Sequence, residues 1–347
     1  MATPVTAPNA RRTRGGARLR LYSRATLFAV LVAFVISVAG GSGNDAAAGR
    51  LGGDFPAFYA AGTIVAEGDW STLYDPARQL EAQAGLFEDD DDGFLYFAYP
   101  PYVASLYRPL ASLDYRLAYT LHTLAMTAAV VGALAVLRPT ISLLRRNFEL
   151  CLTATVLFYP LFRAATGGQN TALTVLLIAV AWRALHDDHD LAAGVAIGLL
   201  LYKPQFALPL MGLLLLGRRW QATASALATG GILWAVGAAV MGGNWLATWW
   251  SEASDFAALD ADVNGHNAVS FLGFAEGLWG AGSAAALLVG GPLALATGLG
   301  LAWMWFRGVG ALDVRMAATV AGVVLLSPHA MFYDAGLVAL VGLVAVD

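Results

Sequence analysis

Apolar runs of about 20 residues recur along this chain between short polar stretches, which is typical of a helical protein that crosses a membrane many times. The pattern predicts an all-α fold with about ten spans. We place these spans at residues 24–41, 115–137, 148–166, 170–186, 190–203, 205–217, 221–241, 284–306, 316–327 and 335–346. Residues 42–114 and 242–268 are too polar to span, and the Gly-rich residues 269–282 are expected to be interfacial or re-entrant.

Arginines gather in alternate loops of this pattern. Six arginines precede residue 25, and others follow predicted spans at Arg218 and Arg307. Because cytoplasmic loops carry an excess of basic residues, we predict a cytoplasmic basic arm at residues 1–23 and one multi-pass domain at 24–347 in the plasma membrane, with both termini inside. Residues 42–114 then form a large first loop on the outer face. A cleavable signal peptide is the alternative for the first apolar run, but many spans follow it, which favours an uncleaved helix.

The composition agrees with a membrane protein and excludes several kinds of site. Of the 347 residues, 58% are hydrophobic and 13% are charged, against about one quarter charged in a soluble domain. The single cysteine, Cys151, excludes an intramolecular disulfide and a cysteine-based metal site. The basic residues form no stripe that would bind nucleic acid. We expect no metal and no cofactor, because the histidines are scattered and the acidic run at 88–92, expected to be a solvated loop, lacks the spacing of a calcium loop.

Two predicted helices, 190–203 and 205–217, are too short for straight crossings and meet at Lys203. Short or broken helices at membrane depth usually line a cavity. Lys203 is the only lysine of the chain and falls on the predicted outer side, so it is a candidate anion site, with phosphate the favoured anion. The alternative is a lysine that snorkels from a helix end to the interface. Arg163, at the outer end of another predicted helix, is a second candidate phosphate contact.

The stretch GGQN, residues 167–170, joins two predicted spans through flexible glycines and two amides. Glycines let a backbone approach a ligand closely, so Gln169 and Asn170 are candidate binding residues. The alternative for Asn170 is an ordinary helix cap.

Two other stretches place polar or aromatic side chains near the predicted outer face. In FAYPPYVASLYRPL, residues 97–110, consecutive prolines predict an extended turn rather than a helix, and Tyr99 is placed to stack on a sugar ring. The alternative is an aromatic belt at the interface. In SPHAMFYD, residues 327–334, His329 and Asp334 would not share a helical face closely, and a simple loop is the alternative.

Six stretches follow one another in chain order: GGDFPAFYAAG, GDWSTLYD, FAYPPYVASLYRPL, GGQNTALTVLLIA, AAGVAIGLLLYKPQFALPLMGLLLLGRRW and LSPHAMFYD. Together they resemble glycosyltransferase family 87, the membrane mannosyltransferases that use a polyprenyl-phosphate sugar. The resemblance covers residues 50–220 well and 325–334 in outline, whereas 221–320 contributes only hydropathy. It implies the C-type glycosyltransferase fold (GT-C), a multi-helix membrane bundle with its site on the non-cytoplasmic face.

The resemblance also implies roles for particular residues. Asp54 matches the family's acidic residue in the first outer loop, so we expect it to be the general base that takes a proton from the acceptor hydroxyl. Lys203, Arg163 and His329 would bind the donor phosphate and stabilise it as it leaves. Direct displacement with one base would invert the anomeric configuration. The other expected substrate contacts are Tyr59, Tyr99, Gln169, Asn170 and Asp334.

The expected partners are a polyprenyl-phosphate sugar donor, a glycolipid or glycan acceptor, and the lipid bilayer. Mannose is the family's common sugar, while glucose and arabinose stay open, as do a wall polysaccharide and a protein as acceptors. A lipid-linked-sugar flippase or transporter is the alternative function, because short helices and a buried lysine suit it equally. The chain shows no two halves of similar hydropathy, which argues against that alternative. A non-catalytic subunit of an envelope-assembly complex is the third.

Overall fold

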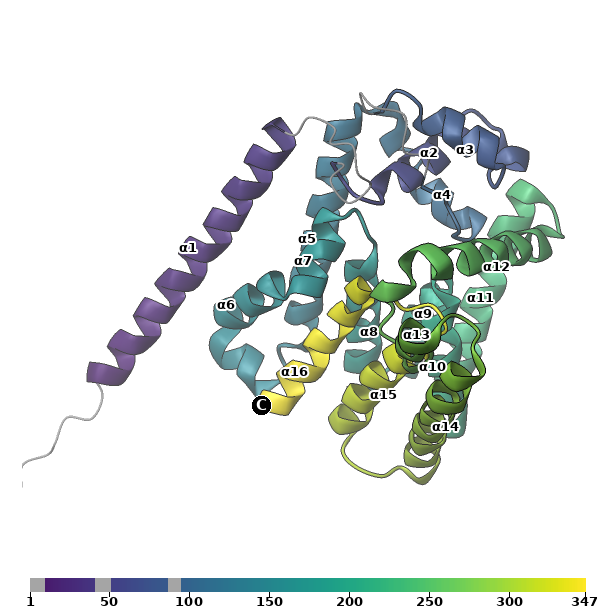
Figure 1. Ribbon diagram of the computed structural model, residues 1–347. Coiled ribbons are helices and arrows are strands. Elements are labelled where there is room, and N and C mark those ends of the chain that lie inside the picture. Colours follow the sequence, from purple (N-terminus) through teal and green to yellow (C-terminus); the bar gives the residue numbers. More distant parts are fainter. Residues whose placement is uncertain (1–9, 41–50, 87–94) are drawn as a thin grey trace, which may run out of the picture.

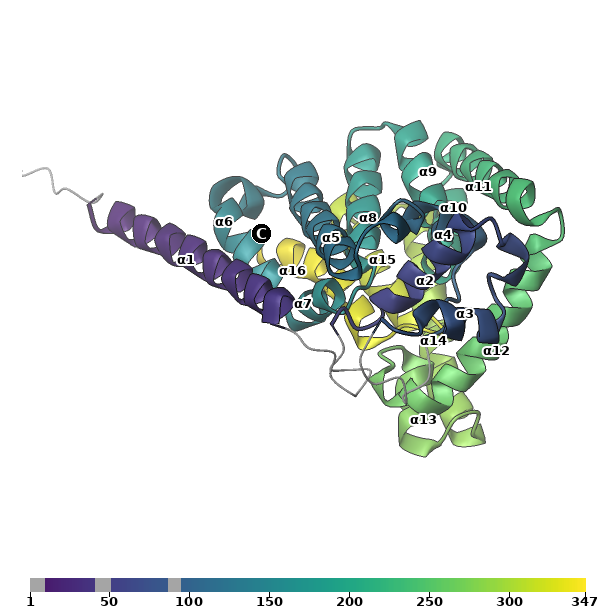
Figure 2. The same cartoon turned by 90° about the horizontal axis from the view of Figure 1, so that it is seen from above.

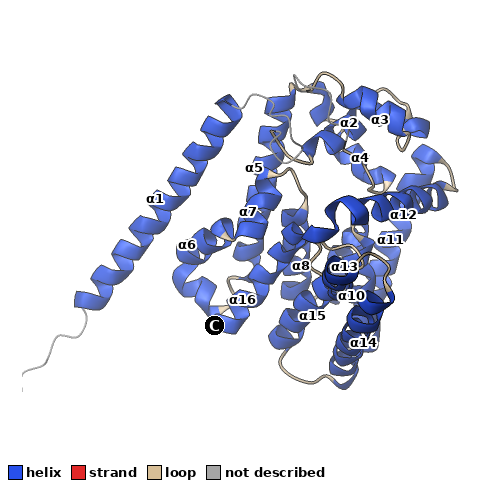
Figure 3. Cartoon of the chain, viewed as in Figure 1, coloured by secondary structure: helices blue, strands red, loops and turns tan. Residues whose placement is uncertain are grey.

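The computed structural model describes residues 10–40, 51–86 and 95–347. Within these ranges the chain forms helices and no strand, as Figures 1 and 3 show, and one isolated β-bridge joins Ala268 to Met331. The α-helices are α1 Ala10–Gly40, α2 Phe55–Ala66, α3 Pro76–Gln83, α4 Pro101–Tyr107, α5 Tyr115–Leu137, α6 Ser142–Leu157, α7 Tyr159–Thr166, α8 Thr171–His186, α9 Asp190–Leu199, α10 Pro204–Leu216, α11 Trp220–Met241, α12 Trp245–Asn264, α13 Phe271–Trp279, α14 Ala284–Arg307, α15 Leu312–Leu326 and α16 Val338–Val346.

Four of the described helices are long and apolar enough to cross a membrane: α1, over Gly16–Gly40, and α5, α11 and α14. A fifth span results if α6 and α7 are counted as one helix pair, which is bent by 68°. Other apolar helices, α2 and α8 to α10 among them, are shorter. The prediction of a helical, multi-pass membrane protein is therefore supported, but helix length and composition do not confirm ten spans.

The bend between α6 and α7 corrects the expectation of one straight helix over 148–166. Pro160 lies in the first turn of α7, where a proline is favoured, but inside a continuous helix it would remove a backbone hydrogen bond. The predicted helix break at Lys203 is confirmed, and a proline again causes it. Lys203 has φ −126° and ψ 78°, because the residue before Pro204 avoids the helical conformation, and α10 starts at the proline.

The first loop, expected at 42–114, holds three helices in its described part. Helix α2 is apolar and mostly buried, although 12 residues are too few to span. The extended conformation predicted at the consecutive prolines is found at Pro100, with φ −55° and ψ 150°, but the prolines do not prevent a helix, so that part of the prediction was wrong. Pro101 is the first residue of α4, a position where its fixed φ suits the helix and its missing N–H costs nothing. The second polar segment, expected at 242–268, contains α12, and α13 lies in the Gly-rich stretch that follows.

Helices α2, α3, α4 and α12 gather at the end of the bundle where α1 ends (Figure 1), and Figure 2 shows α1 standing apart from the main body. Several arginine-bearing loops meet at the other end. Arg183 Nη1 donates to Thr140 Oγ1 at 3.1 Å, and Arg219 Nη1 donates to Asp188 Oδ1 at 2.8 Å. These bonds bring together the loops α5–α6, α8–α9 and α10–α11. The arginine pattern of the sequence thus corresponds to one end of the folded bundle.

Two glycine loops interlock where α2 and α8 begin. The Asp54 N–H donates to the Gly167 carbonyl at 2.9 Å. Gly52, Gly53 and Gly168 have φ of 93°, 52° and 68°, a region that other residues rarely adopt. A Cβ on Gly168 would lie 2.4 Å from the Gly52 carbonyl oxygen, so the backbones meet where no side chain fits. This contact places the GGD and GGQ stretches, 115 residues apart in sequence, against each other.

Gly168→Ala is expected to destabilise the protein, because alanine would have to adopt a strained φ and its Cβ would collide with the Gly52 carbonyl. The expected loss in the free energy of unfolding is about 1–3 kcal/mol. The matched control is Gly231→Ala in α11, where an added Cβ meets nothing within 4 Å and should be tolerated. Thermal unfolding in nanodiscs, followed by tryptophan fluorescence, measures both. Equal midpoints for the two variants would contradict the interlocked-loop geometry.

Candidate active site

Asp54 and Gln169 meet at the contact of the two glycine loops. Asp54 is the N-cap residue of α2 but makes no side-chain cap hydrogen bond, so its carboxylate does not serve its own helix. Instead, Gln169 Nε2 donates to Asp54 Oδ2. The Gln169 side chain is buried, with 5% of the residue exposed, and its Oε1 has no hydrogen-bond partner among the described residues. A carboxylate and a buried amide therefore form one polar pair.

The surroundings of Asp54, which lies outside the candidate spans, act on its protonation in opposite directions. Burial raises the pKa of the Asp54 carboxyl above its ordinary value, and the negative charge of Asp260 adds to the rise. The hydrogen bond from Gln169 and the positive charges of Arg163 and Lys203 lower it. Burial is the largest of these causes, so the pKa stays raised. Asp260, Arg163 and Lys203 are therefore the charged residues that act on the Asp54 carboxylate.

Lys203 and Asp334 form a buried ion pair. Lys203 Nζ lies 2.7 Å from Asp334 Oδ1, and each side chain is 4% exposed. Asp334 also accepts from Thr171 Oγ1 at 3.2 Å and from the Met331 N–H at 3.4 Å. The ammonium lies 5.7 Å from the centre of the Tyr333 ring, within cation–π range. Lys203 does not snorkel to an interface, because both its burial and its partner hold it inside.

The GGQN loop also connects to this ion pair through aromatic side chains. Tyr99 Oη donates to Asn170 Oδ1 at 3.4 Å, and the Tyr99 ring stacks on Tyr202 with centroids 6.4 Å apart. Asn170 is the N-cap residue of α8, but its side chain makes no cap hydrogen bond. Tyr202 precedes Lys203 directly, and its hydroxyl lies 2.6 Å from Thr174 Oγ1. The simple cap is therefore not the role of the Asn170 side chain.

His329 and Asp334 separate, as the sequence predicted, although not along one helix. The chain leaves its helical path between α15 and a 3₁₀ helix at Phe332–Leu337, so the two side chains point to different partners. His329 Nε2 lies 3.6 Å from Asp260 Oδ2, an ion pair when the imidazole is protonated. Asn264 Nδ2 donates to Asp260 Oδ1 at 2.6 Å. The histidine therefore reaches the Asp54 surroundings through α12.

Arg163 and Tyr59, both predicted to be site residues, differ from each other in their contacts. Arg163 lies in the last turn of α7 and makes no ion pair within the described part of the chain. Tyr59 is not brought to the cluster. Its hydroxyl donates to the Leu113 carbonyl at 2.9 Å, and its ring packs edge-on against Tyr115. Its observed contacts are those of a packing residue of α2.

Asp260, which lies close to His329 and acts on the Asp54 carboxylate, is a site residue that the sequence did not indicate. It lies near the end of α12, in a segment expected to be a polar loop, and no motif marks it. The only signal was a run of acidic residues among apolar ones, which is also typical of a solvated helix face. No group of three or more His, Cys, Asp or Glu side chains within described ranges could hold a metal ion. The acidic run at 88–92 lies outside the described residues.

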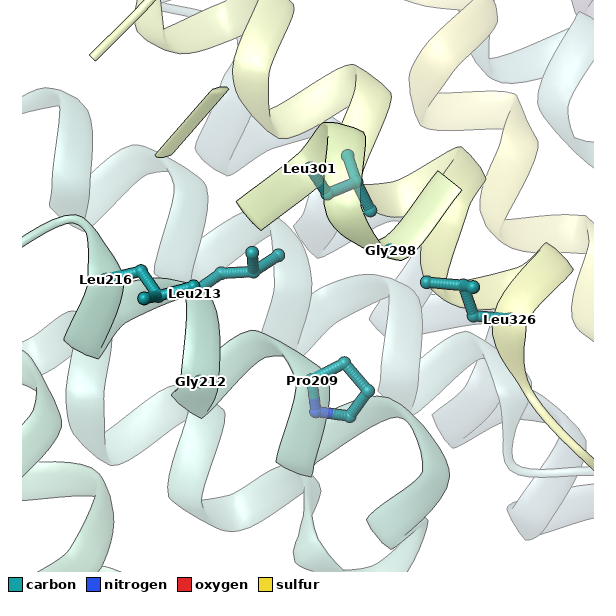
Figure 4. Close-up of a pocket in the computed structure, with 7 residues that line it drawn as sticks. All are labelled: Pro209, Gly212, Leu213, Leu216, Gly298, Leu301 and Leu326. Atoms are coloured by element: carbon teal, nitrogen blue, oxygen red, sulfur yellow. The ribbon is translucent and has the colours of Figure 1, made fainter. Parts of the chain in front are cut away.

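An apolar cavity of about 190 Å³ lies between α10, α14 and α15 (Figure 4). Its lining residues are Pro209, Gly212, Leu213, Leu216, Gly298, Leu301 and Leu326. It carries no group that could perform acid–base chemistry. Helix α10 connects the two regions, because Lys203 caps its start and Pro209 stands about 9 Å further along at 1.5 Å per residue.

The model of glycosyltransferase family 87 matches residues 97–328, more than half of the chain. The chain belongs to glycosyltransferase family 87. Membership in this family indicates a glycosyltransferase. Comparison with the curated proteins and with the solved structures finds no match. The family 87 match includes 221–320, where the sequence contributed only hydropathy, and it covers Arg163, Gln169 and Lys203. It stops before His329 and starts after Asp54, and the roles of all five of these residues stay predictions.

The Lys203–Asp334 pair of this family 87 protein should show strong coupling in stability. Lys203→Met or Asp334→Leu alone would leave an unpaired charge in the interior and is expected to cost about 3–5 kcal/mol of unfolding free energy. The double variant should cost less than either single variant, because no charge is stranded. Unfolding in nanodiscs measures this cycle. Glu81→Gln, which removes an exposed ion pair to Arg78, is the control and should change stability by at most about 1 kcal/mol. Additive losses in the double variant would contradict a buried pair.

Proposed function

We propose that this family 87 protein transfers a sugar, with mannose the first candidate, from a polyprenyl phosphate to a hydroxyl of a lipid or glycan acceptor. Asp54 acts as the general base. The observation that supports this most directly is the Asp54 carboxylate, which Gln169 holds by a hydrogen bond and on which the charges of Arg163 and Lys203 act. Burial raises the pKa of Asp54, which is the direction that a general base needs, and the phosphate of the donor needs cations nearby.

In this reaction the acceptor hydroxyl gives its proton to Asp54 while its oxygen attacks the anomeric carbon. The bond between that carbon and the phosphate oxygen breaks, and the phosphate takes the electron pair. Attack from the side opposite the phosphate inverts the anomeric configuration. The leaving group already carries negative charge, so fixed cations stabilise it without a proton from an acid.

The donor phosphate is best placed between Arg163 and Lys203. Arg163 has no ion-pair partner in the described structure, and a guanidinium binds phosphate oxygens through two parallel hydrogen bonds. Lys203 would share its ammonium between Asp334 and the phosphate. Helix α10 then leads from Lys203 to the apolar cavity, which suits part of a polyprenyl chain. A lipid-linked donor therefore fits this end of the bundle better than a soluble nucleotide sugar.

The orientation of the bundle follows from its arginine-bearing end. If that end is cytoplasmic, as the excess of basic residues predicts, Asp54 and Lys203 face outside. In this orientation the protein lies in the plasma membrane with its N-terminus inside.

Asp54→Asn should remove transfer activity while leaving the fold intact. The loss expected from removing a general base is about 10²- to 10⁴-fold in kcat/KM. Purified wild type and variant in nanodiscs, given radiolabelled polyprenyl-phosphate mannose and a panel of glycolipid acceptors, supply the measurement. For wild type, kcat/KM should rise with pH as Asp54 ionises through its raised pKa. Equal transfer by both proteins would assign the base elsewhere.

Asp54→Asn should also change the pH dependence of the unfolding temperature in a defined direction. Because the folded-state pKa of Asp54 is above its unfolded value, ionisation costs the native state stability as pH rises through the folded pKa. Asparagine cannot ionise, so Asp54→Asn should unfold at the same or a higher temperature than wild type at neutral pH. The difference should disappear as pH falls toward about 4, the unfolded pKa of aspartate. A variant less stable than wild type at neutral pH would argue against a buried base.

Single-cysteine labelling tests the orientation, in a background where Cys151, which is buried, is replaced by serine. Glu81→Cys in α3 should react with a membrane-impermeant maleimide on intact cells, because Glu81 is exposed at the Asp54 end. Arg218→Cys, in the loop between α10 and α11, should react only after permeabilisation. The reversed result would place the site in the cytoplasm and exclude the proposed location.

A further inference from the structure

The buried amide of Gln169 has one unsatisfied atom. Its Nε2 donates to Asp54, whereas its Oε1 is buried without a hydrogen-bond partner among the described residues. Buried polar atoms without a partner are rare in folded proteins, and each one calls for an explanation. Gln169 is also held in place, because its own N–H donates to the Ala164 carbonyl at 2.8 Å. The backbone bond and the contact of Nε2 with Asp54 restrain both ends of the residue, while Oε1 lacks a donor.

The other carboxylate oxygen of Asp54 also lacks a hydrogen-bond donor among the described residues, although Asp54 is only half-buried. Asp54 Oδ2 accepts from Gln169, and Oδ1 accepts no hydrogen bond from the described residues. The two amide atoms of Gln169 share one carbon, so Oε1 lies next to the nitrogen that holds Asp54. The pair consequently leaves two hydrogen-bond acceptors, Asp54 Oδ1 and Gln169 Oε1, on two groups that are hydrogen-bonded to each other. A ligand that satisfies both must supply two donors that are close together.

We propose that Asp54 and Gln169 bind two neighbouring hydroxyls of the acceptor, the reacting one on Asp54 and the adjacent one on Gln169 Oε1. This inference rests on the proposed function and narrows its acceptor to a sugar or other polyol with a vicinal diol. The reacting hydroxyl loses its proton to Asp54 and forms the new bond to the anomeric carbon. The adjacent hydroxyl keeps its proton and fixes the orientation. An isolated serine or threonine hydroxyl of a protein would leave Gln169 Oε1 unpaired.

Gln169 also favours the ionised form of the base. A donor hydrogen bond to a carboxylate stabilises the charged state, and removing the donor raises the pKa of that carboxylate. Replacing Gln169 by leucine should therefore move the acid limb of the kcat/KM profile to higher pH. A residue with only a structural role would lower the rate without moving the limb. This separates a positioning residue from a packing residue.

The test pairs Gln169→Leu with altered acceptors. Wild type and variant in nanodiscs receive radiolabelled polyprenyl-phosphate mannose with octyl mannoside and each of its monodeoxy derivatives. For wild type, we expect no transfer to the derivative that lacks the reacting hydroxyl. The derivative that lacks the adjacent hydroxyl should have a kcat/KM about 10-fold or more lower than octyl mannoside. A derivative that lacks a more distant hydroxyl should have a kcat/KM close to that of octyl mannoside. For Gln169→Leu, we expect a similar loss with octyl mannoside and no further loss with the adjacent deoxy derivative. The acid limb should move upward.

Other outcomes would overturn the proposal in distinguishable ways. If wild type tolerates the loss of every hydroxyl except the reacting one, or if the losses from substitution and deoxygenation multiply, Gln169 does not read an adjacent hydroxyl. If wild type glycosylates a serine- or threonine-containing peptide but no octyl mannoside, the glycosyltransferase function stands and the diol inference fails. If wild type transfers to no acceptor and does not bind the donor, the proposed function fails and this inference fails with it.

Discussion

The contact between the two glycine loops is the constraint on which the site depends. A backbone hydrogen bond from Asp54 to the Gly167 carbonyl, and glycines where side chains would collide, hold the start of α2 against the start of α8. A carboxylate and an amide from distant parts of the chain thereby meet within hydrogen-bond distance. Because Asn170 and Thr171 follow Gln169 directly, the same contact also brings in the network around Asp334.

Hydropathy predicted most helices of the bundle closely. The expected ranges 115–137, 170–186 and 221–241 correspond within a residue to α5, α8 and α11, because long apolar runs bounded by polar residues leave little choice of register. The predictions were wrong where proline decided the local structure. Pro160 starts a new helix after a bend, and Pro101 starts α4 where an extended turn was expected. A proline indicates a break in a helix, but the sequence alone does not show whether a helix lies before or after that proline.

The site was predicted in part, because short polar stretches could be recognised but their partners could not. The GGDF and GGQN stretches and Lys203 were candidates from their residue types, and the structure brings them into one region. Nothing in the sequence indicated that Lys203 would pair with Asp334, since 131 residues separate them. Asp260 was missed because its importance arises only from the path of α12 across the bundle. The chemical roles of all these residues stay predictions.

The buried pair of Lys203 and Asp334 has a consequence for turnover. An anion that reaches the ammonium must compete for it with a carboxylate 2.7 Å away. The carboxylate limits how tightly any phosphate can be held, and it restores the neutral pair as soon as the phosphate departs. In the proposed reaction, this built-in competitor favours release of the spent polyprenyl phosphate, so the enzyme avoids inhibition by a product whose head group resembles that of its donor.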